Sequence, residues 1–367
     1  MPLFIYALSL AVFAQGMSEF MLSGLVPDIA AGLSVGVGAA ANLTSAYAIG
    51  MVVGAPVMAA LSARWPRRRA LATFLLVFVA VHVIGAVTHD FAVLFGTRIV
   101  AAVANAGFLA VAMSVASTVA RQARATATLI GGVTLACVAG VPGGAFLGQF
   151  FGWRSAFWAV AILSLPALVL VFRSAPAEPG LRRDIAVRKE FRVLRSVWQP
   201  LVLAALVNGA TFATFAYLAV VATDVAGLPA GAVPWLLAGF GAGAFVGVTM
   251  AERFPLRFAL CVVPVGWAIL AATSTVPVAL FVMTVVQGAL SFGVGTALVS
   301  RVLAADAPTL GGSFATVALN VGAVVGPVLA GVVNAVWLSV GLSALALVLL
   351  PFFRREADDP RVVQSGR

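Results

Sequence analysis

The chain has 367 residues, of which 62% are hydrophobic and only 9% are charged, and its formal net charge is +10. Soluble domains carry about 25% charged residues, so this composition excludes a soluble globular protein. The basic residues stand in short gaps between apolar runs, and this distribution argues against nucleic acid as a partner.

Twelve apolar runs of about 20 residues follow one another along the chain, and this is the length that spans a bilayer as a helix. They do not alternate as the strands of a membrane barrel would. We therefore predict an all-α integral membrane protein with twelve transmembrane helices in two six-helix, pseudo-symmetric halves. The expected spans are 4–26, 39–61, 70–88, 92–116, 126–149, 155–172, 200–223, 230–250, 257–274, 278–299, 312–333 and 336–353.

Two polar segments divide the apolar runs. The predicted organisation is an N-terminal bundle at 1–172, a linker at 173–199, a C-terminal bundle at 200–353 and a tail at 354–367. Under this topology, 20 of the 22 Lys and Arg residues fall on the side that carries both termini. Positive residues in short loops mark the cytoplasmic face, so we expect a multi-pass protein of the bacterial plasma membrane with both termini in the cytoplasm.

An internal repeat supports the division into two halves. The stretch SARWPRRRAL, which starts at residue 62, matches AERFPLRFAL, which starts at residue 251, at five of ten positions. At the same offset of 189 residues, Gly50 and Gly54 fall on Gly239 and Gly243. Duplicated halves are typical of secondary transporters, in which one half rocks against the other around a central site.

Two charged residues lie inside the predicted spans, Glu19 in the first and Arg98 in the fourth. A charge at the bilayer centre costs about 2.5–3.5 kcal/mol on insertion scales. Both residues are expected in the outer half of the membrane, where they could meet. We interpret them as a protonatable carboxylate beside a fixed cation. The alternative is an ion pair that only stabilises the packing of the helices. Buried ion pairs, however, rarely stabilise a protein more than apolar residues in the same positions would.

Other polar and aromatic residues of the spans are candidates for a substrate cavity. Each polar residue could equally form a hydrogen bond between two helices. Each phenylalanine could equally pack against lipid or a neighbouring helix. The predicted substrate-binding residues are Gln15, Phe20, Asn105, Phe108, Asn208, Phe212, Tyr217 and Asn320. Gln287 and Phe215 belong to the same class.

The fifth span contains GVPGGAFLG, in which Gly140, Gly144 and Gly148 recur every four residues and Pro142 stands within the same segment. Small residues at this spacing let helices approach closely, and proline kinks a helix. The pattern indicates either a static packing seam or a sliding contact between the halves.

Signatures of other chemistries are missing from the sequence. There is no Walker A motif for ATP, no HExxH zinc motif, and no cysteine–histidine spacing that suits a metal. We therefore expect no cofactor and no metal, and a protein that is not an enzyme.

Several of these motifs together resemble the major facilitator superfamily. The pair GVPGGAFLG and GWRSAFW resembles the antiporter motif of its twelve-span drug:proton group, and SEFMLSGLVPDIA in the first span is similar to the actinobacterial chloramphenicol exporters. The resemblance implies that Glu19 senses both drug and proton and that Arg98 tunes it. It also implies that the turn between the second and third spans latches the halves.

The latch departs from the family pattern, because Ala63 stands where an aspartate is usual and Pro66 where a glycine is usual. The repeat suggests that Glu252 contributes the carboxylate instead. The expected conformational gate comprises Arg64, Arg67, Arg68, Arg69, Gly140, Pro142, Gly144, Glu252 and Arg253.

The expected function is efflux of chloramphenicol or a related phenicol by alternating access, driven by the proton gradient. The expected partners are a small hydrophobic drug, protons and the lipid bilayer, and we expect a monomer. The alternatives are a sugar or metabolite exporter or a broad multidrug exporter on the same scaffold, and a membrane subunit that does not transport.

Overall fold

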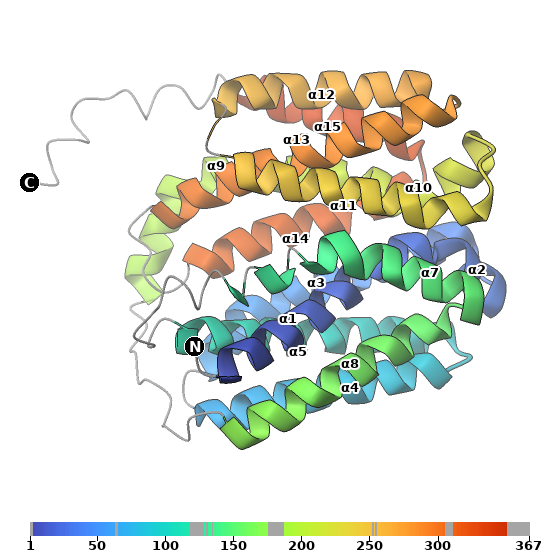
Figure 1. Ribbon diagram of the computed structural model, residues 1–367. Coiled ribbons are helices and arrows are strands. Elements are labelled where there is room, and N and C mark those ends of the chain that lie inside the picture. The colour runs from blue at the N-terminus through green and yellow to red at the C-terminus, as the bar shows by residue number, and fades with distance from the viewer. Residues whose placement is uncertain are drawn as a thin grey trace, which may run out of the picture.

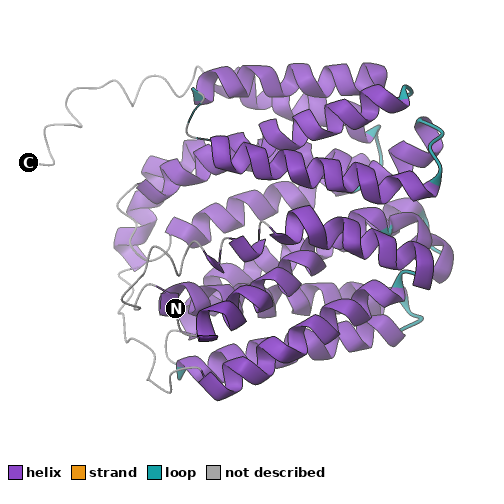
Figure 2. Ribbon diagram, in the orientation of Figure 1, coloured by secondary structure: helices purple, strands orange, loops and turns teal. Residues whose placement is uncertain are grey.

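The computed structural model describes residues 3–62, 65–116, 128–129, 131–133, 135–174, 187–251, 253, 255–304 and 311–350. Within these residues the regular structure is entirely helical (Figure 2). Eleven helices in this part of the chain are long and apolar enough to cross a membrane, and a shorter apolar helix, α15 (Ala335–Leu349), follows them. The protein is thus a multi-pass membrane protein.

The N-terminal half begins with a broken span. Helix α1 (Leu3–Phe20) passes through a 3₁₀ turn, η1 (Met21–Gly24), into α2 (Val26–Leu33). Next come α3 (Val37–Ser62), α4 (Arg67–Val87) and α5 (Phe91–Ala116). A π-helical turn, η2 (Ala136–Gly140), leads into α7 (Val141–Phe151), and α8 (Arg154–Ser174) closes the half.

The C-terminal half also opens with a broken span. Helix α9 (Val187–Phe215) is followed by the short α10 (Leu218–Val220), the π-helical turn η3 (Val221–Val225) and the 3₁₀ turn η4 (Ala230–Ala232). Helices α11 (Val233–Met250), α12 (Leu256–Thr273), α13 (Pro277–Ala304) and α14 (Gly311–Ala330) precede α15. Both ends of the segment 173–199, expected as a polar linker, are therefore helical.

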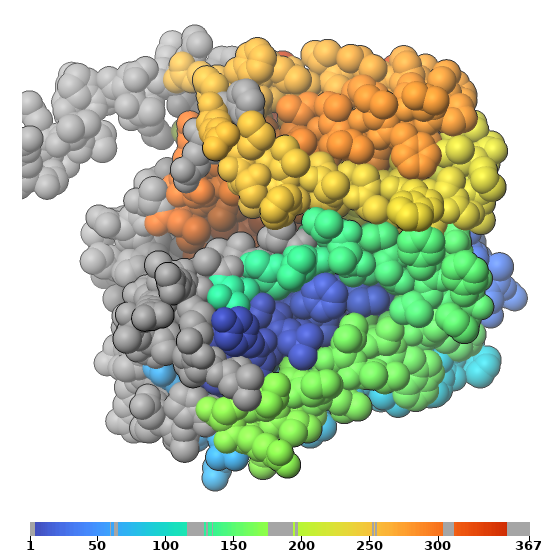
Figure 3. All heavy atoms as spheres, in the orientation of Figure 1, coloured from blue at the N-terminus to red at the C-terminus, as the bar shows by residue number. Residues whose placement is uncertain are grey.

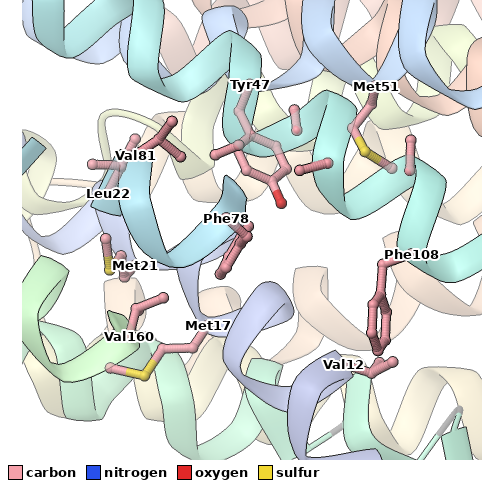
Figure 4. Close-up of a cluster of buried hydrophobic side chains, with 14 of the residues drawn as sticks. Val12, Met17, Met21, Leu22, Tyr47, Met51, Phe78, Val81, Phe108 and Val160 are labelled. Carbon is pink, nitrogen blue, oxygen red and sulfur yellow. The ribbon is translucent and has the colours of Figure 1, made fainter. Parts of the chain in front are cut away.

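The helices form two stacked groups that run in roughly the same direction (Figure 1), with α1–α8 in one group and α9–α15 in the other. Each group has a large apolar core, and a few residues of the other group join each one, such as Ala330 in the first and Val141 in the second. The core of the first group includes Met17, Met21, Phe78 and Phe108, which converge in Figure 4. The two halves predicted from the repeat are thus two packed bundles.

Glycines let the paired helices of each half approach closely. A Cβ on Gly50 would collide with the carbonyl oxygen of Ile99, so α3 can lie against α5 only with glycine there. In the second half, a Cβ on Gly243 would collide with the carbonyl oxygen of Val285 in the α11–α13 pair. Glycines singled out by the repeat thus serve the same close packing in both halves.

Charges differ between the two ends of the bundle. We call the end that carries Arg67–Arg69, Arg173, Arg253, Arg257 and Arg301 the basic end. The opposite end carries the turns at 34–36, 88–90, 226–229 and 331–334, together with the carboxylates Asp28, Asp90 and Asp224.

The two halves touch each other toward the opposite end. The Ser45 hydroxyl on α3 donates to the Val324 carbonyl on α14 at 3.1 Å. A Cβ on Gly38 would lie 3.8 Å from the Cα of Gly331, where α3 begins and α14 has just ended. On another side, the amide of Gln149 donates to a carbonyl in η4. These contacts hold the halves together at this end of the molecule.

Candidate functional site

Arg98 on α5 is a fully buried cation, with 1% of its surface exposed. Its Nη1 donates to the Ser18 hydroxyl and its Nη2 donates to the Ser18 carbonyl, both at 2.7 Å. The guanidinium carbon also lies 4.5 Å from the ring centroid of Tyr47, a cation–π distance. Arg98 is therefore fixed to α1 and α3, and only its Nε has no partner.

Ser18 is also hydrogen-bonded to His82 of α4, which extends the chain of hydrogen bonds that begins at Arg98. The Ser18 Oγ lies 2.7 Å from His82 Nε2, and His82 Nδ1 lies 2.7 Å from the Phe78 carbonyl. Because a carbonyl can only accept, Nδ1 must carry the proton and Nε2 accepts from the serine hydroxyl. The hydrogen bonds thus run in one direction from Arg98 through Ser18 and His82 to the backbone.

Ser18 and His82 were not among the residues predicted for the site. A histidine inside a membrane span is itself a signal, because intramembrane ionisable residues are usually functional. Ser18 gave no such signal, since a serine next to Glu19 could equally bond to its own helix. Its role depends on how α1 is rotated against α4 and α5, and apolar periodicity does not fix that rotation.

Glu19 lies next to this chain but is not part of it. Its side chain is half-buried, and its carboxylate makes no hydrogen bond or ion pair to any residue that the structure describes. Arg98 is near enough for its charge to act on the carboxylate, although the hydrogen bonds of Arg98 go to Ser18. The two intramembrane charges are neighbours, as expected, but they do not form an ion pair in this state.

Further polar groups without partners lie close by. Gln15 is one helical turn before Glu19 and therefore lies on the same face of α1. It is 1% exposed, and neither atom of its amide has a hydrogen-bond partner. Asn105, two turns after Arg98, donates to the Tyr47 hydroxyl at 2.8 Å but leaves its own Oδ1 without a donor. Such buried groups need water or a ligand, since each unsatisfied group costs about 1–3 kcal/mol.

A cluster of aromatic side chains joins the two halves beside this polar region. Phe20 of α1 lies 6.1 Å from Phe212 and 6.4 Å from Phe215 of α9, between ring centroids. Phe215 lies 4.7 Å from Phe240 of α11, which in turn lies 5.9 Å from Phe292 of α13. We call these five residues the aromatic cluster.

The cluster encloses a small apolar cavity between the halves. Four of its rings line the cavity together with Cys137, Val141, Leu237, Gly241 and Ala244. The free volume is only about 10 Å³, whereas pockets for drug-sized ligands hold about 300–1,000 Å³. In this state the rings fill most of the space between the halves, and they must separate before a ligand of that size can enter.

The aromatic cluster lies next to breaks in both spans that begin the two halves. Helix α1 ends at Phe20, and α9 ends at Phe215. Pro27 contributes to the first break, because it has no N–H to bond the carbonyl of Ser23 in η1. Interrupted helices at corresponding positions of two repeats are the usual location of transporter binding sites. Phe240 and Phe292 were not predicted, because nothing in a run of apolar residues shows which phenylalanine faces the partner half.

The remaining predicted substrate-binding residues lie elsewhere in this state. Phe108 is fully buried in the core of the N-terminal half, where it points toward Val12 (Figure 4). Asn208 donates to the Leu319 carbonyl at 2.7 Å and so joins α9 to α14. Asn320 donates to its own helix, and the Tyr217 hydroxyl lies 3.4 Å from the Pro327 carbonyl. In this state Phe108 packs in the core, and the polar groups of the other three bond backbone carbonyls. Asn208 stands one helical turn before Phe212 of the aromatic cluster.

The glycine face of the fifth span packs against its own half. A Cβ on Gly140 would lie 3.0 Å from the Cβ of Met17, and a Cβ on Gly144 would lie 2.9 Å from that of Met21. Between them Pro142 follows the π-helical turn, where the helix changes geometry. Gly140 and Gly144 therefore pack within one half, against the methionines of α1 and η1. The same span also meets the other half, because a Cβ on Gly241 of α11 would collide with the carbonyl oxygen of Cys137. A sliding contact between the halves stays a prediction.

The arginines of the expected gate are only partly described. Arg64 and Glu252 lie outside the described residues. Arg67 is buried, Arg69 and Arg253 are exposed, and Arg68 stacks over the ring of Phe172 on α8 at 4.8 Å. The contact of Arg68 lies within the N-terminal half.

Comparison with known proteins agrees with this architecture. Residues 8–259 match the family model of the Major Facilitator Superfamily. A Chloramphenicol resistance protein of Streptomyces lividans is 49% identical over 96% of both chains. The Inner membrane transport protein YdhP of Escherichia coli (strain K12) is 31% identical over 97% of both chains.

Two solved structures share the fold at low sequence identity. A bacterial homologue of the human lysosomal transporter Spinster, in an inward-facing and unoccupied conformation, aligns with a TM-score of 0.73 and 19% identity, over 90% of this chain and 80% of that one. The peptide transporter POT in complex with sulfate aligns with a TM-score of 0.75 and 14% identity, over 95% and 93%. The chain is a transporter rather than an enzyme, and it belongs to the Major Facilitator Superfamily.

Proposed function

We propose that the protein exports chloramphenicol or a related phenicol across the bacterial plasma membrane in exchange for protons. The observation that carries the proposal is the 49% identity, over 96% of both chains, to the Streptomyces Chloramphenicol resistance protein. The aromatic cluster supports it, because an apolar site between the halves suits a small aromatic drug better than a sugar, which needs many polar partners.

Glu19 is the proposed exchange point between drug and proton. It is followed directly by Phe20 of the aromatic cluster, and its carboxylate has no fixed partner among the described residues. Drug that enters between the rings displaces the proton of Glu19, and the charge of Arg98 then favours the carboxylate. When the opposite end opens, the drug leaves and a proton returns to Glu19. One chain suffices for this cycle, and we propose a monomer.

The charge asymmetry supports an orientation in which the basic end, with both termini, faces the cytoplasm. In that orientation the hydrogen bonds from Ser45 to Val324 and from Gln149 to η4 lie toward the outer side. A proton that enters through 100 mV supplies about 2.3 kcal/mol, and one pH unit adds about 1.4 kcal/mol. Because a tenfold gradient costs about 1.4 kcal/mol, exchange of one proton sustains a drug gradient of several hundredfold.

The test is accumulation of labelled chloramphenicol in cells that express the chain, with and without a protonophore. The parent should lower accumulation, and the protonophore should abolish that effect. Glu19→Gln should accumulate drug as cells without the protein do, while Asp224→Asn, an exposed carboxylate outside the spans, should behave as the parent.

Uncoupler-insensitive export, or full resistance with Glu19→Gln, would contradict the proposed coupling. Equal export of chemically unrelated drugs would indicate a broad multidrug exporter. Normal expression of a parent that never lowers accumulation would support a membrane subunit without transport.

A further inference from the structure

A second apolar site lies on the outside of the C-terminal half, away from the aromatic cluster. It is a groove between α11, α12 and α13, with a free volume of about 170 Å³. Its walls include Val246 and Met250 of α11, Leu256 and Phe258 of α12, and Leu290 and Val294 of α13. Val246 is 46% exposed and Phe258 is 62% exposed, so the groove opens to the outside.

Small residues create the groove. A Cβ on Gly247 would collide with the carbonyl oxygen of Ala289, so α11 and α13 are in close contact there. Gly293 and Ala297, one turn apart on α13, leave the space beside this contact unfilled. These three helices lie side by side on the face of the molecule shown in Figure 3. The surroundings of this face in a membrane are lipid chains.

Three arginines of the basic end are close in sequence to residues that line the groove. Ala251 and Leu256 line the groove, and Arg253 and Arg257 belong to the turn and first residues of α12 next to them. Arg301 follows Ala297 by four positions and therefore continues the same face of α13. All three are exposed, and none has a hydrogen bond, ion pair or ring contact to another described residue.

We propose that this groove binds one acyl chain of an anionic phospholipid, whose phosphate is held by Arg253, Arg257 and Arg301. An apolar groove that ends in cations matches a molecule with an apolar chain and an anionic head. Basic pockets between membrane helices bind the head groups of anionic lipids in this way. A drug fits less well, because drug pockets bury most of the ligand surface, and free phosphate would leave the groove unused.

The test uses the full chain purified in detergent and titrated with phosphatidylglycerol or phosphatidylcholine of identical acyl chains, with bound lipid counted by native mass spectrometry. The parent should retain phosphatidylglycerol about tenfold more tightly than phosphatidylcholine. The variant with Arg253→Gln, Arg257→Gln and Arg301→Gln should lose that preference. Arg173→Gln, an exposed arginine of the other half, should keep it.

Two further measurements distinguish a lipid bound in the groove from a lipid that is only attracted by the positive charges. Ala297→Leu fills the groove and should weaken binding of both lipids several-fold while leaving the arginines in place. Inorganic phosphate should not displace phosphatidylglycerol. The proposal is overturned if the triple variant keeps the preference, if Ala297→Leu binds as the parent does while eluting as a folded monodisperse species, or if inorganic phosphate competes as well as the lipid does.

Discussion

At the scale of single residues, the main feature is that the buried arginine is bonded to a serine and not to the neighbouring carboxylate. The hydroxyl and the carbonyl of Ser18 both accept hydrogen bonds from Arg98, and the same hydroxyl is hydrogen-bonded to His82. Glu19 is thereby left without a permanent partner. A carboxylate locked in an ion pair could not exchange a proton readily, so in the proposed cycle Ser18 keeps Glu19 available for protonation.

Ser18→Ala should destabilise the protein by more than an ordinary buried serine substitution does. It leaves Arg98 Nη1 and His82 Nε2 buried without partners, and each such group costs about 1–3 kcal/mol. The matched control is Ser164→Ala, because Ser164 is equally buried but bonds only the Val160 carbonyl of its own helix. The measurement is the midpoint of thermal unfolding in detergent. Equal midpoints for the two variants would contradict the hydrogen-bond chain.

Phe240→Leu should weaken drug transport by raising the half-saturating drug concentration. Phe240 lines the apolar cavity, and a contact between its ring and an aromatic drug contributes about 0.5–1.5 kcal/mol beyond burial. We therefore expect an increase of about 2–12-fold, with little change in proton coupling. Phe245→Leu is the control, since Phe245 lies on the outer side of the same helix and is 47% exposed. A similar effect of both variants would argue against the aromatic cluster as the drug site.

At the scale of elements, run length and hydropathy predicted where the helices lie, because lipid forces each span to be apolar over a fixed length. The starts of α4 and α12 follow Pro66 and Pro255, as the repeat indicates. The helical conformation of the polar first turns of α9 could not be predicted from hydropathy. Hydropathy shows which residues lie within the membrane, and it does not show whether a polar segment outside the membrane is helical. The break at Tyr217 has no proline signal, and it became visible only in the structure.

The glycines of the repeat give a prediction at the same scale. Gly243→Ala should destabilise the C-terminal half by about 1–3 kcal/mol, the usual cost of overpacking, because the added Cβ meets the Val285 backbone on α13. Gly295→Ala on α13 is the control, since its Cβ would meet nothing within 4 Å. The control should gain about 1 kcal/mol from helix propensity. Opposite shifts of the unfolding midpoint are expected, and a neutral Gly243→Ala would contradict the close approach.

At the scale of the whole molecule, the two halves meet in the aromatic cluster and also through hydrogen bonds toward the opposite end. The polar contacts are a serine to a carbonyl and a glutamine to a carbonyl, and two glycines face each other across a narrow gap nearby. Bonds of this kind are individually weak, about 0.5–1.5 kcal/mol net. Such an interface can separate during a transport cycle, whereas the large apolar cores keep each half intact.

A disulfide across this interface should stop transport reversibly. Gly38 and Gly331 are close enough to test it, because a Cβ on Gly38 would lie 3.8 Å from the Cα of Gly331 and disulfides join residues at such separations. The Tyr217 hydroxyl, 3.1 Å from a Cβ on Gly331, has to move aside. The pair Gly38→Cys and Gly331→Cys is built in a background with Cys137→Ala and Cys261→Ala, since both native cysteines are free. Oxidation should abolish drug export, and a reductant should restore it, because the opposite end must open in every cycle. Each single cysteine variant should be insensitive to oxidant. Export that continues at full rate in fully cross-linked protein would mean that the halves do not separate at this end, and the alternating-access cycle proposed above would then be wrong.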